Sequence, residues 1–158
     1  NYFMKLTTKG RYAIIAMVDL AMNSEHDPVS LKDVSARQNI SLSYLEQLFA
    51  RLRAAGLVKS YRGPGGGYSL NKEATSINLL DVITAVDENM DQTQCSGAMN
   101  CIDEKPCLTH YIWIGLNNTI NQYMKGINLN DVALREDVKN IIFLREKGNV
   151  NSNQRQKK

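Results

Sequence analysis

Three cysteines and one histidine fall within 16 residues and are the part of this chain most suited to chemistry. They are Cys95, Cys101, Cys107 and His110, spaced C-x5-C-x5-C-x2-H, and the sequence contains no other cysteine. Thiolates bind iron and zinc strongly, and an imidazole adds a fourth donor that is neutral and titratable. Cysteines grouped in a polar, acidic stretch are poorly explained as buried core residues. The pattern therefore predicts a metal centre.

The four donors alone leave the identity of the metal open. A tetrahedral Cys3His set is an ordinary zinc site, and the spacing from Cys101 to His110 approaches that of Cys3His zinc fingers that bind RNA. An iron–sulfur cluster can also take a histidine in place of a cysteine, which raises its potential and makes it sensitive to pH. His26, in contrast, is an isolated loop histidine for which we predict no role.

The elements upstream of the cysteines follow a helix-turn-helix pattern. Residues 10–23 carry apolar side chains at helical spacing. Ser30 can cap a short helix that ends near Asn39, and a second, amphipathic helix runs over residues 40–55 until Gly56 stops it. Ser41 can cap this second helix, and Ser43 with Glu46 also fits a capping box. Two short helices joined by a tight polar turn predict a DNA-binding unit.

A β-hairpin is predicted directly after this unit, which is where a winged helix carries its wing. Residues 57–62 and 68–70 are strand candidates, and the glycine-rich run between them must turn. Arg62 at the wing tip can enter a minor groove, and Gly65 and Gly66 let the backbone approach phosphates closely. The alternatives are a plain hairpin turn with a solvated arginine, or a phosphate-binding loop, which lacks its Gly-Lys-Ser/Thr ending here.

The first turns of the second helix would face the DNA bases. The residues concerned are Ser41, Ser43, Tyr44, Glu46 and Gln47. Gln47 can pair with adenine through two hydrogen bonds, whereas Glu46 can accept from a cytosine amino group but repels phosphates. The plainer alternative is that the serines only cap the helix and Glu46 only completes a capping box.

Four segments are predicted along the chain, in a mostly α fold with a small β-hairpin wing. Residues 4–86 form a winged helix-turn-helix DNA-binding domain, with Asn78 capping a helix over residues 79–86. Residues 87–107 are the metal-binding loop. Residues 108–135 hold a long helix and a short following helix, and the polar, basic residues 148–158 are expected to be a disordered tail.

Charge and composition narrow the class of protein further. Residues 1–71 carry nine basic and five acidic residues, net +4, and this suggests a polyanionic partner. There is no apolar run of 18 residues and no secretory signal, with Met4 the expected start. An odd number of cysteines argues against a secreted disulfide framework. We therefore expect a cytoplasmic protein without a membrane partner, and no enzyme, because no nucleophile–base motif is present.

Residues 4–13, 40–53 and 58–68, together with the Cys/His set, resemble the Rrf-type bacterial winged-helix regulators, and among them those that respond to iron–sulfur clusters. The resemblance covers about residues 4–135. It implies a homodimer formed through a crossed long helix at residues 108–124, and pseudo-palindromic operators. It also implies a [2Fe–2S] cluster held by the three thiolates and the imidazole, with zinc or [4Fe–4S] as alternatives. The loaded protein would repress genes for cluster assembly, and the assembly machinery would donate the cluster.

The resemblance also implies roles at the DNA surface. Ser41, Ser43 and Gln47 match base-contacting positions, and Arg62 matches the wing contact. Glu46 would disfavour a first class of operators until the cluster is bound, while a second class is bound with or without it. The rivals are a nitric-oxide-sensing repressor of the same family, which His110 and residues 41–47 disfavour, a Cys3His zinc module that binds nucleic acid, and a small redox enzyme.

Overall fold

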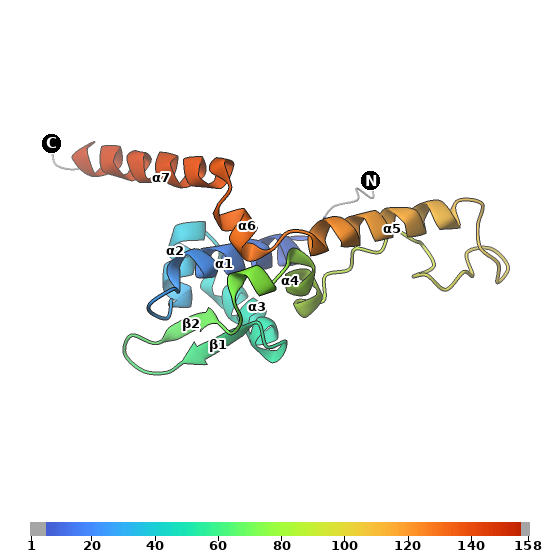
Figure 1. The fold of residues 1–158 in the computed structure, drawn as a ribbon, viewed down its shortest axis with the longest axis horizontal. Helices are drawn as coiled ribbons and strands as arrows, with labels where there is room; N and C mark the ends of the chain where they lie inside the picture. The colour runs from blue at the N-terminus through green and yellow to red at the C-terminus, as the bar shows by residue number, and fades with distance from the viewer. Residues whose placement is uncertain (1–5, 156–158) are drawn as a thin grey trace.

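A computed structural model describes residues 6–155 of the chain, and the surroundings of the side chains of residues 6–148. The elements, in chain order, are α1 (Thr8–Asn23), α2 (Leu31–Gln38), α3 (Leu42–Ala54), β1 (Val58–Tyr61), β2 (Gly67–Leu70), the 3-10 turn η1 (Ala74–Ser76), α4 (Leu79–Ala85), α5 (His110–Lys125), α6 (Leu129–Ala133) and α7 (Glu136–Arg155). Figure 1 shows the first seven as one body, with α5 and the loop before it projecting to one side and α7 lying on the other. The predicted fold class is confirmed.

Local capping explains where the helix-turn-helix begins and ends. The backbone N–H of Asp33 donates to Ser30 Oγ at 3.1 Å and starts α2, and Asn39, at φ 53°, makes the turn. Ser41, rather than Ser43, is the N-cap of α3, because its Oγ accepts from the N–H of Tyr44 at 3.1 Å. Gly56 ends α3 in the left-handed conformation that favours glycine.

The wing is a two-stranded antiparallel hairpin fastened to the helices. Strands β1 and β2 pair from Val58 opposite Leu70 to Tyr61 opposite Gly67. Val29, between α1 and α2, exchanges two backbone hydrogen bonds of 2.8 Å with Tyr68. A Cβ at Gly67 would collide with the carbonyl of Val29, so only glycine allows this close approach. The wing is therefore held at a defined angle to the helix-turn-helix.

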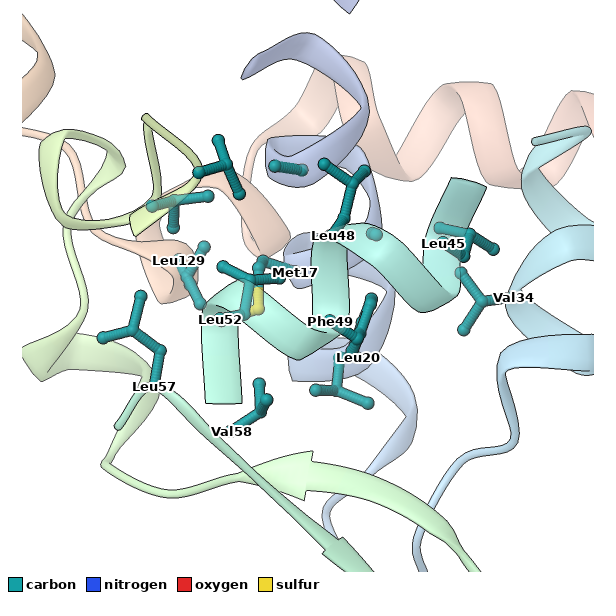
Figure 2. Close-up of a cluster of buried hydrophobic side chains, with 14 of the residues drawn as sticks. Met17, Leu20, Val34, Leu45, Leu48, Phe49, Leu52, Leu57, Val58 and Leu129 are labelled. Carbon is teal, nitrogen blue, oxygen red and sulfur yellow. The ribbon is translucent and has the colours of Figure 1, made fainter. Parts of the chain in front are cut away.

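One hydrophobic core holds the helices and the wing together. Figure 2 shows Phe49 and Leu52 of α3 among side chains from α1, α2, the β1 region and α6. Phe49 is fully buried, and the ring of Tyr68 on β2 packs edge-on against it with ring centroids 4.9 Å apart. The core therefore sets the positions of both elements that are predicted to face DNA, α3 and the wing.

Helix α6 belongs to this core, although the sequence grouped it with the long helix before it. Leu129 is fully buried, and its N–H donates to the carbonyl of Ile77 at 2.9 Å. The N–H of Leu79 donates in turn to the carbonyl of Ile127 at 2.9 Å. In the sequence, α6 is grouped with the long helix because the two are adjacent in the chain. A pairing between segments about 50 residues apart leaves no periodic signal in the sequence.

We expect Leu129→Ala to destabilise the whole body formed by α1–α4, the wing and α6 by about 2–5 kcal/mol, because it leaves a cavity in the shared core. The measurement is urea denaturation of the full chain followed by far-UV circular dichroism. The matched control is Leu134→Ala, because Leu134 is exposed on the following turn. Equal, small effects of the two substitutions would contradict the assignment of α6 to the core.

Helix α7 differs from the expectation for the end of the chain. Residues 148–155, predicted to be disordered, continue α7 as far as Arg155, and residues 156–158 lie outside the described residues. Two acidic residues, Glu136 and Asp137, stand in the first turn of α7, where they favour a helix start. Extending a helix that has begun costs less than nucleating one, so polar residues can prolong it. Among the described residues, no helix is both long and apolar enough to cross a bilayer.

Candidate metal centre and nucleic-acid interface

The loop between α4 and α5 brings three of the four predicted ligands together. One ligand atom each from Cys95, Cys101 and His110 lies within 4.8 Å of the other two. Nδ1 of His110 is 3.5 Å from Sγ of Cys95 and 3.8 Å from Sγ of Cys101. His110 is the first residue of α5 and is only 2% exposed. The long helix, predicted to start at Leu108, therefore begins on a predicted ligand.

Cys107 lies beside this group rather than within it. Its Sγ is 3.8 Å from Oγ1 of Thr109, the N-cap of α5, and its carbonyl accepts from the N–H of His110 at 3.2 Å. The backbone N–H of Cys107 lowers the pKa of Cys101, whereas its side chain raises that pKa, so the two residues are neighbours.

Left-handed backbone folds the cysteine loop on itself. Between Cys95 and Cys107 four residues other than glycine have positive φ values: Ser96, Met99, Asp103 and Glu104. Each such residue costs roughly 1 kcal/mol relative to ordinary backbone, and such strain gathers where a loop clamps a ligand. The loop therefore gives up regular secondary structure and adopts turns that bring the thiols close together.

The thiols differ in acidity because their surroundings differ. Burial raises the pKa of Cys95, but hydrogen bonds from Cys101, the backbone N–H groups of Met99 and Gly97, and His110 outweigh it and lower that pKa to about 6. The backbone N–H of Cys107 lowers the pKa of Cys101, yet the bond to Cys95 and burial leave it raised. Hydrogen bonds from the backbone and hydroxyl of Thr109 lower the pKa of Cys107.

The donor chemistry fits either of two centres. Three thiols of unequal acidity and a buried imidazole suit a zinc ion, which takes Cys3His sets. They also suit an iron–sulfur cluster in which histidine replaces one cysteine. The fit rests on three donor atoms, one each from Cys95, Cys101 and His110, that lie within 4.8 Å of one another.

The predicted DNA-facing residues of α3 line a groove shared with α1. Ser41, Ser43, Tyr44 and Gln47 border a groove of about 480 Å³. Its other wall contains Thr8 and Tyr12 of α1, together with Asn39 and Ile40 of the turn. The ring of Tyr12 packs edge-on against Tyr44 with centroids 5.9 Å apart. Thr8 and Tyr12 were missed from the sequence, because only the fold shows that α1 adjoins α3 here.

Glu46 and the wing tip lie outside this groove. Glu46 is exposed on α3, and Arg62 and Gly65 are exposed in the turn after β1. Gly66 is half-buried, and a Cβ there would collide with the carbonyl of Tyr61. The turn itself therefore requires Gly66, which is a reason separate from approach to phosphate. DNA contact by these residues stays a prediction.

A helix-turn-helix followed directly by a β-hairpin wing defines a winged-helix DNA-binding protein. The family profile described as "Rrf2: Iron-dependent Transcriptional regulator" matches residues 6–135. The chain is 53% identical over 135 residues to the HTH-type transcriptional regulator IscR of Escherichia coli, covering 85% of this chain and 83% of that protein. The chain therefore belongs to the Rrf2 family, whose members are transcription regulators rather than enzymes.

Solved structures agree with this assignment. IscR of T. potens is 38% identical with a TM-score of 0.67, covering 80% of this chain and 84% of that one. CymR, the global cysteine regulator of B. subtilis, is 33% identical with a TM-score of 0.72, covering 83% and 97%. The family profile ends at residue 135, so α7 lies outside it.

Proposed function

We propose that this protein regulates transcription in response to iron–sulfur cluster supply, through a [2Fe–2S] cluster that its own loop holds. The observation that carries the proposal is the convergence of Cys95, Cys101 and His110 within 4.8 Å, in the loop that leaves the DNA-binding domain. The similarity to IscR supports iron over zinc as the centre. The fraction of the protein that carries a cluster would depend on how many clusters the cell makes available.

The proposed ligand set is Cys95, Cys101, Cys107 and His110. The thiolates bind iron and, because their pKa values differ, Cys95 and Cys107 deprotonate more readily than Cys101. A single imidazole among thiolates makes the set weaker and more pH-sensitive than four cysteines. A labile cluster suits a protein that reports supply, with the assembly machinery as donor.

The proposed DNA-binding form is a homodimer on pseudo-palindromic operators. Four large apolar side chains at the start and along α5 are exposed: Leu108, Tyr111, Ile112 and Tyr123. Exposed apolar side chains on one projecting helix favour pairing with a second copy. A two-fold dimer would place two recognition helices in successive major grooves, with Ser41, Ser43, Tyr44, Glu46 and Gln47 at the bases. Arg62 would enter a flanking minor groove, and Gly65 and Gly66 would lie against the phosphates.

The proposed output is mainly repression of cluster-assembly genes by the loaded dimer, which closes a feedback loop. Because operators lie on the chromosome, the proposed place of action is the bacterial cytoplasm.

The decisive experiment is anaerobic purification followed by a visible spectrum, iron, sulfide and zinc analysis, and operator titrations of loaded and cluster-free protein. We expect a brown protein with iron and sulfide in equal amounts, and tighter operator binding when the cluster is present. A colourless protein with one zinc per protomer would overturn the proposal in favour of a zinc module. Equal affinity of both states for an operator of the first class would overturn the sensing role.

A further inference from the structure

The N-terminus of α1 is capped by a residue far away in the sequence. Thr7, the N-cap residue, makes no capping bond with its own side chain, and the first turn contains no acidic residue. Glu88 takes this role: its Oε2 accepts from the N–H of Gly10 at 2.8 Å and from the hydroxyl of Thr7. A carboxylate at a helix N-terminus satisfies orphan N–H groups and is favoured by the helix dipole.

The chain reaches this position through a tight stop at the end of α4. The N–H of Asp87 donates to the carbonyl of Thr84 at 3.1 Å, and the N–H of Glu88 donates to that of Ile83 at 3.0 Å. Asp87 adopts the left-handed conformation, with φ 55°, so the two bonds form a Schellman motif. This motif fixes the direction in which Glu88 leaves α4.

Asp87 adds a second contact, this time to the recognition helix. Its carboxylate lies 2.7 Å from Nη1 of Arg51 on α3, and its carbonyl accepts from Nζ of Lys9 at 2.9 Å. Both side chains of the ion pair are largely exposed, so the pair alone contributes little. The firmer link to the DNA-binding domain is the cap made by Glu88.

On its other side, Glu88 is joined to the cysteine loop by a short hydrogen-bonded segment. The side chain of Asn117 on α5 accepts from the N–H of Gln92 at 2.8 Å and donates to Asp91 at 2.7 Å. Thr93 donates to Asp91, and its hydroxyl accepts from the N–H of Gly97 at 2.9 Å. Cys95 lies within this last turn, only seven residues after Glu88.

The first turn of α1 borders the DNA-reading groove. Thr8 and Tyr12 lie two residues on either side of Gly10, and both line the groove that Ser41 and Gln47 share. Tyr12 also packs against Tyr44. A shift in the cap at Gly10 therefore changes the wall of the groove opposite the recognition residues.

We infer that Glu88 is a positioning residue that couples the cysteine loop to the DNA-reading surface by capping α1. The inference rests on the proposed function, because it describes how a change at the cysteines reaches α1. The position of Cys95 sets the short segment behind Glu88, and that segment sets how well the carboxylate seats on the N–H of Gly10. The groove wall then follows the first turn of α1.

The measured quantity is the coupling ratio, which is the Kd of cluster-free protein for an operator of the first class divided by that of loaded protein. We expect Glu88→Ala to lower this ratio at least about fivefold, within the range of ordinary allosteric couplings, with cluster content per protomer unchanged. The matched control is Glu73→Ala, which removes the same charge from an exposed residue that makes no side-chain cap bond. It should leave the ratio unaltered.

Gly10 allows the same contact to be broken from the other side. A Cβ at residue 10 would lie 2.7 Å from Oε2 of Glu88, so Gly10→Ala must push the carboxylate away. Because alanine has a higher helix propensity than glycine, we expect α1 to form in Gly10→Ala, both alone and combined with Glu88→Ala. We expect Gly10→Ala to lower the coupling ratio in the wild-type background and to change nothing further in Glu88→Ala.

The possible outcomes distinguish failure of the coupling role of Glu88 from failure of the proposed sensing function. A wild-type coupling ratio well above one that is unchanged in Glu88→Ala would overturn the coupling role of Glu88 and leave the proposed function intact. Equal weakening of both states by Glu88→Ala, or additive effects of the two substitutions, would also overturn it, because a purely structural role predicts these. A wild-type ratio near one would refute the proposed function itself.

Discussion

Cys101→Ala is expected to abolish cluster binding and, with it, the difference between loaded and cluster-free protein at the operator. Cys101 lies between the other donors: its Sγ is 3.8 Å from Nδ1 of His110, and both Cys95 and Cys107 influence its pKa. Removing a direct ligand should cost more than the roughly 10–100-fold in affinity that is lost with an outer partner of a ligand. The measurement is iron and sulfide per protomer after anaerobic reconstitution, together with the visible spectrum.

The control separates ligation from general damage to the fold. His26→Ala alters the other histidine of the chain, which is exposed in the loop after α1, and should leave iron content unchanged. His110→Ala should behave like Cys101→Ala, whereas His110→Cys should retain iron with a potential that depends less on pH. Full iron content in Cys101→Ala, with a normal circular dichroism spectrum, would remove this residue from the ligand set.

Much of the fold follows from short-range chemistry, and this part was predictable. Ser30, Ser41 and Asn78 were each expected to cap a helix, and each does, because capping involves a side chain and an N–H three residues away. The glycine stop of α3 and the hairpin turn have the same local character. The ligand candidates were also visible, because cysteine type and spacing are properties of the sequence itself.

What the sequence does not reveal depends on contacts between distant segments. The cap that Glu88 provides to α1 spans 78 residues to Gly10, and no periodicity marks it. The burial of Leu129 beneath η1 is of the same kind. The spacing of the cysteines marks Cys95, Cys101 and Cys107 as candidates, but only the folded loop shows that Cys95 and Cys101 converge on His110 while Cys107 lies beside them. Composition failed for α7, because helix extension tolerates polar residues that composition assigns to disorder.

Glu46→Ala is expected to let cluster-free protein bind operators of the first class about 100-fold more tightly than wild type does. Glu46 is exposed on α3, beside residues that line the groove between α1 and α3. At the base edges its carboxylate would lose water without gaining a donor unless a cytosine amino group is present, and such a loss costs a few kcal/mol. Alanine removes this cost and keeps the helix, because both residues are good helix formers. Anisotropy titrations of cluster-free protein at one fixed salt concentration measure the change.

Removing any acidic residue also strengthens attraction to the DNA backbone, so the gain must be shown to be local. Glu25→Ala makes the same change of charge in the exposed loop between α1 and α2 and should tighten binding only slightly. The gain of Glu46→Ala should also depend on operator class, because we expect sites of the second class to be bound already without a cluster. An equal gain on both classes, or on DNA of unrelated sequence, would mean that Glu46 acts only through net charge. Discrimination by Glu46 requires that the gain follow the base pair facing it, which single substitutions in the operator would reveal.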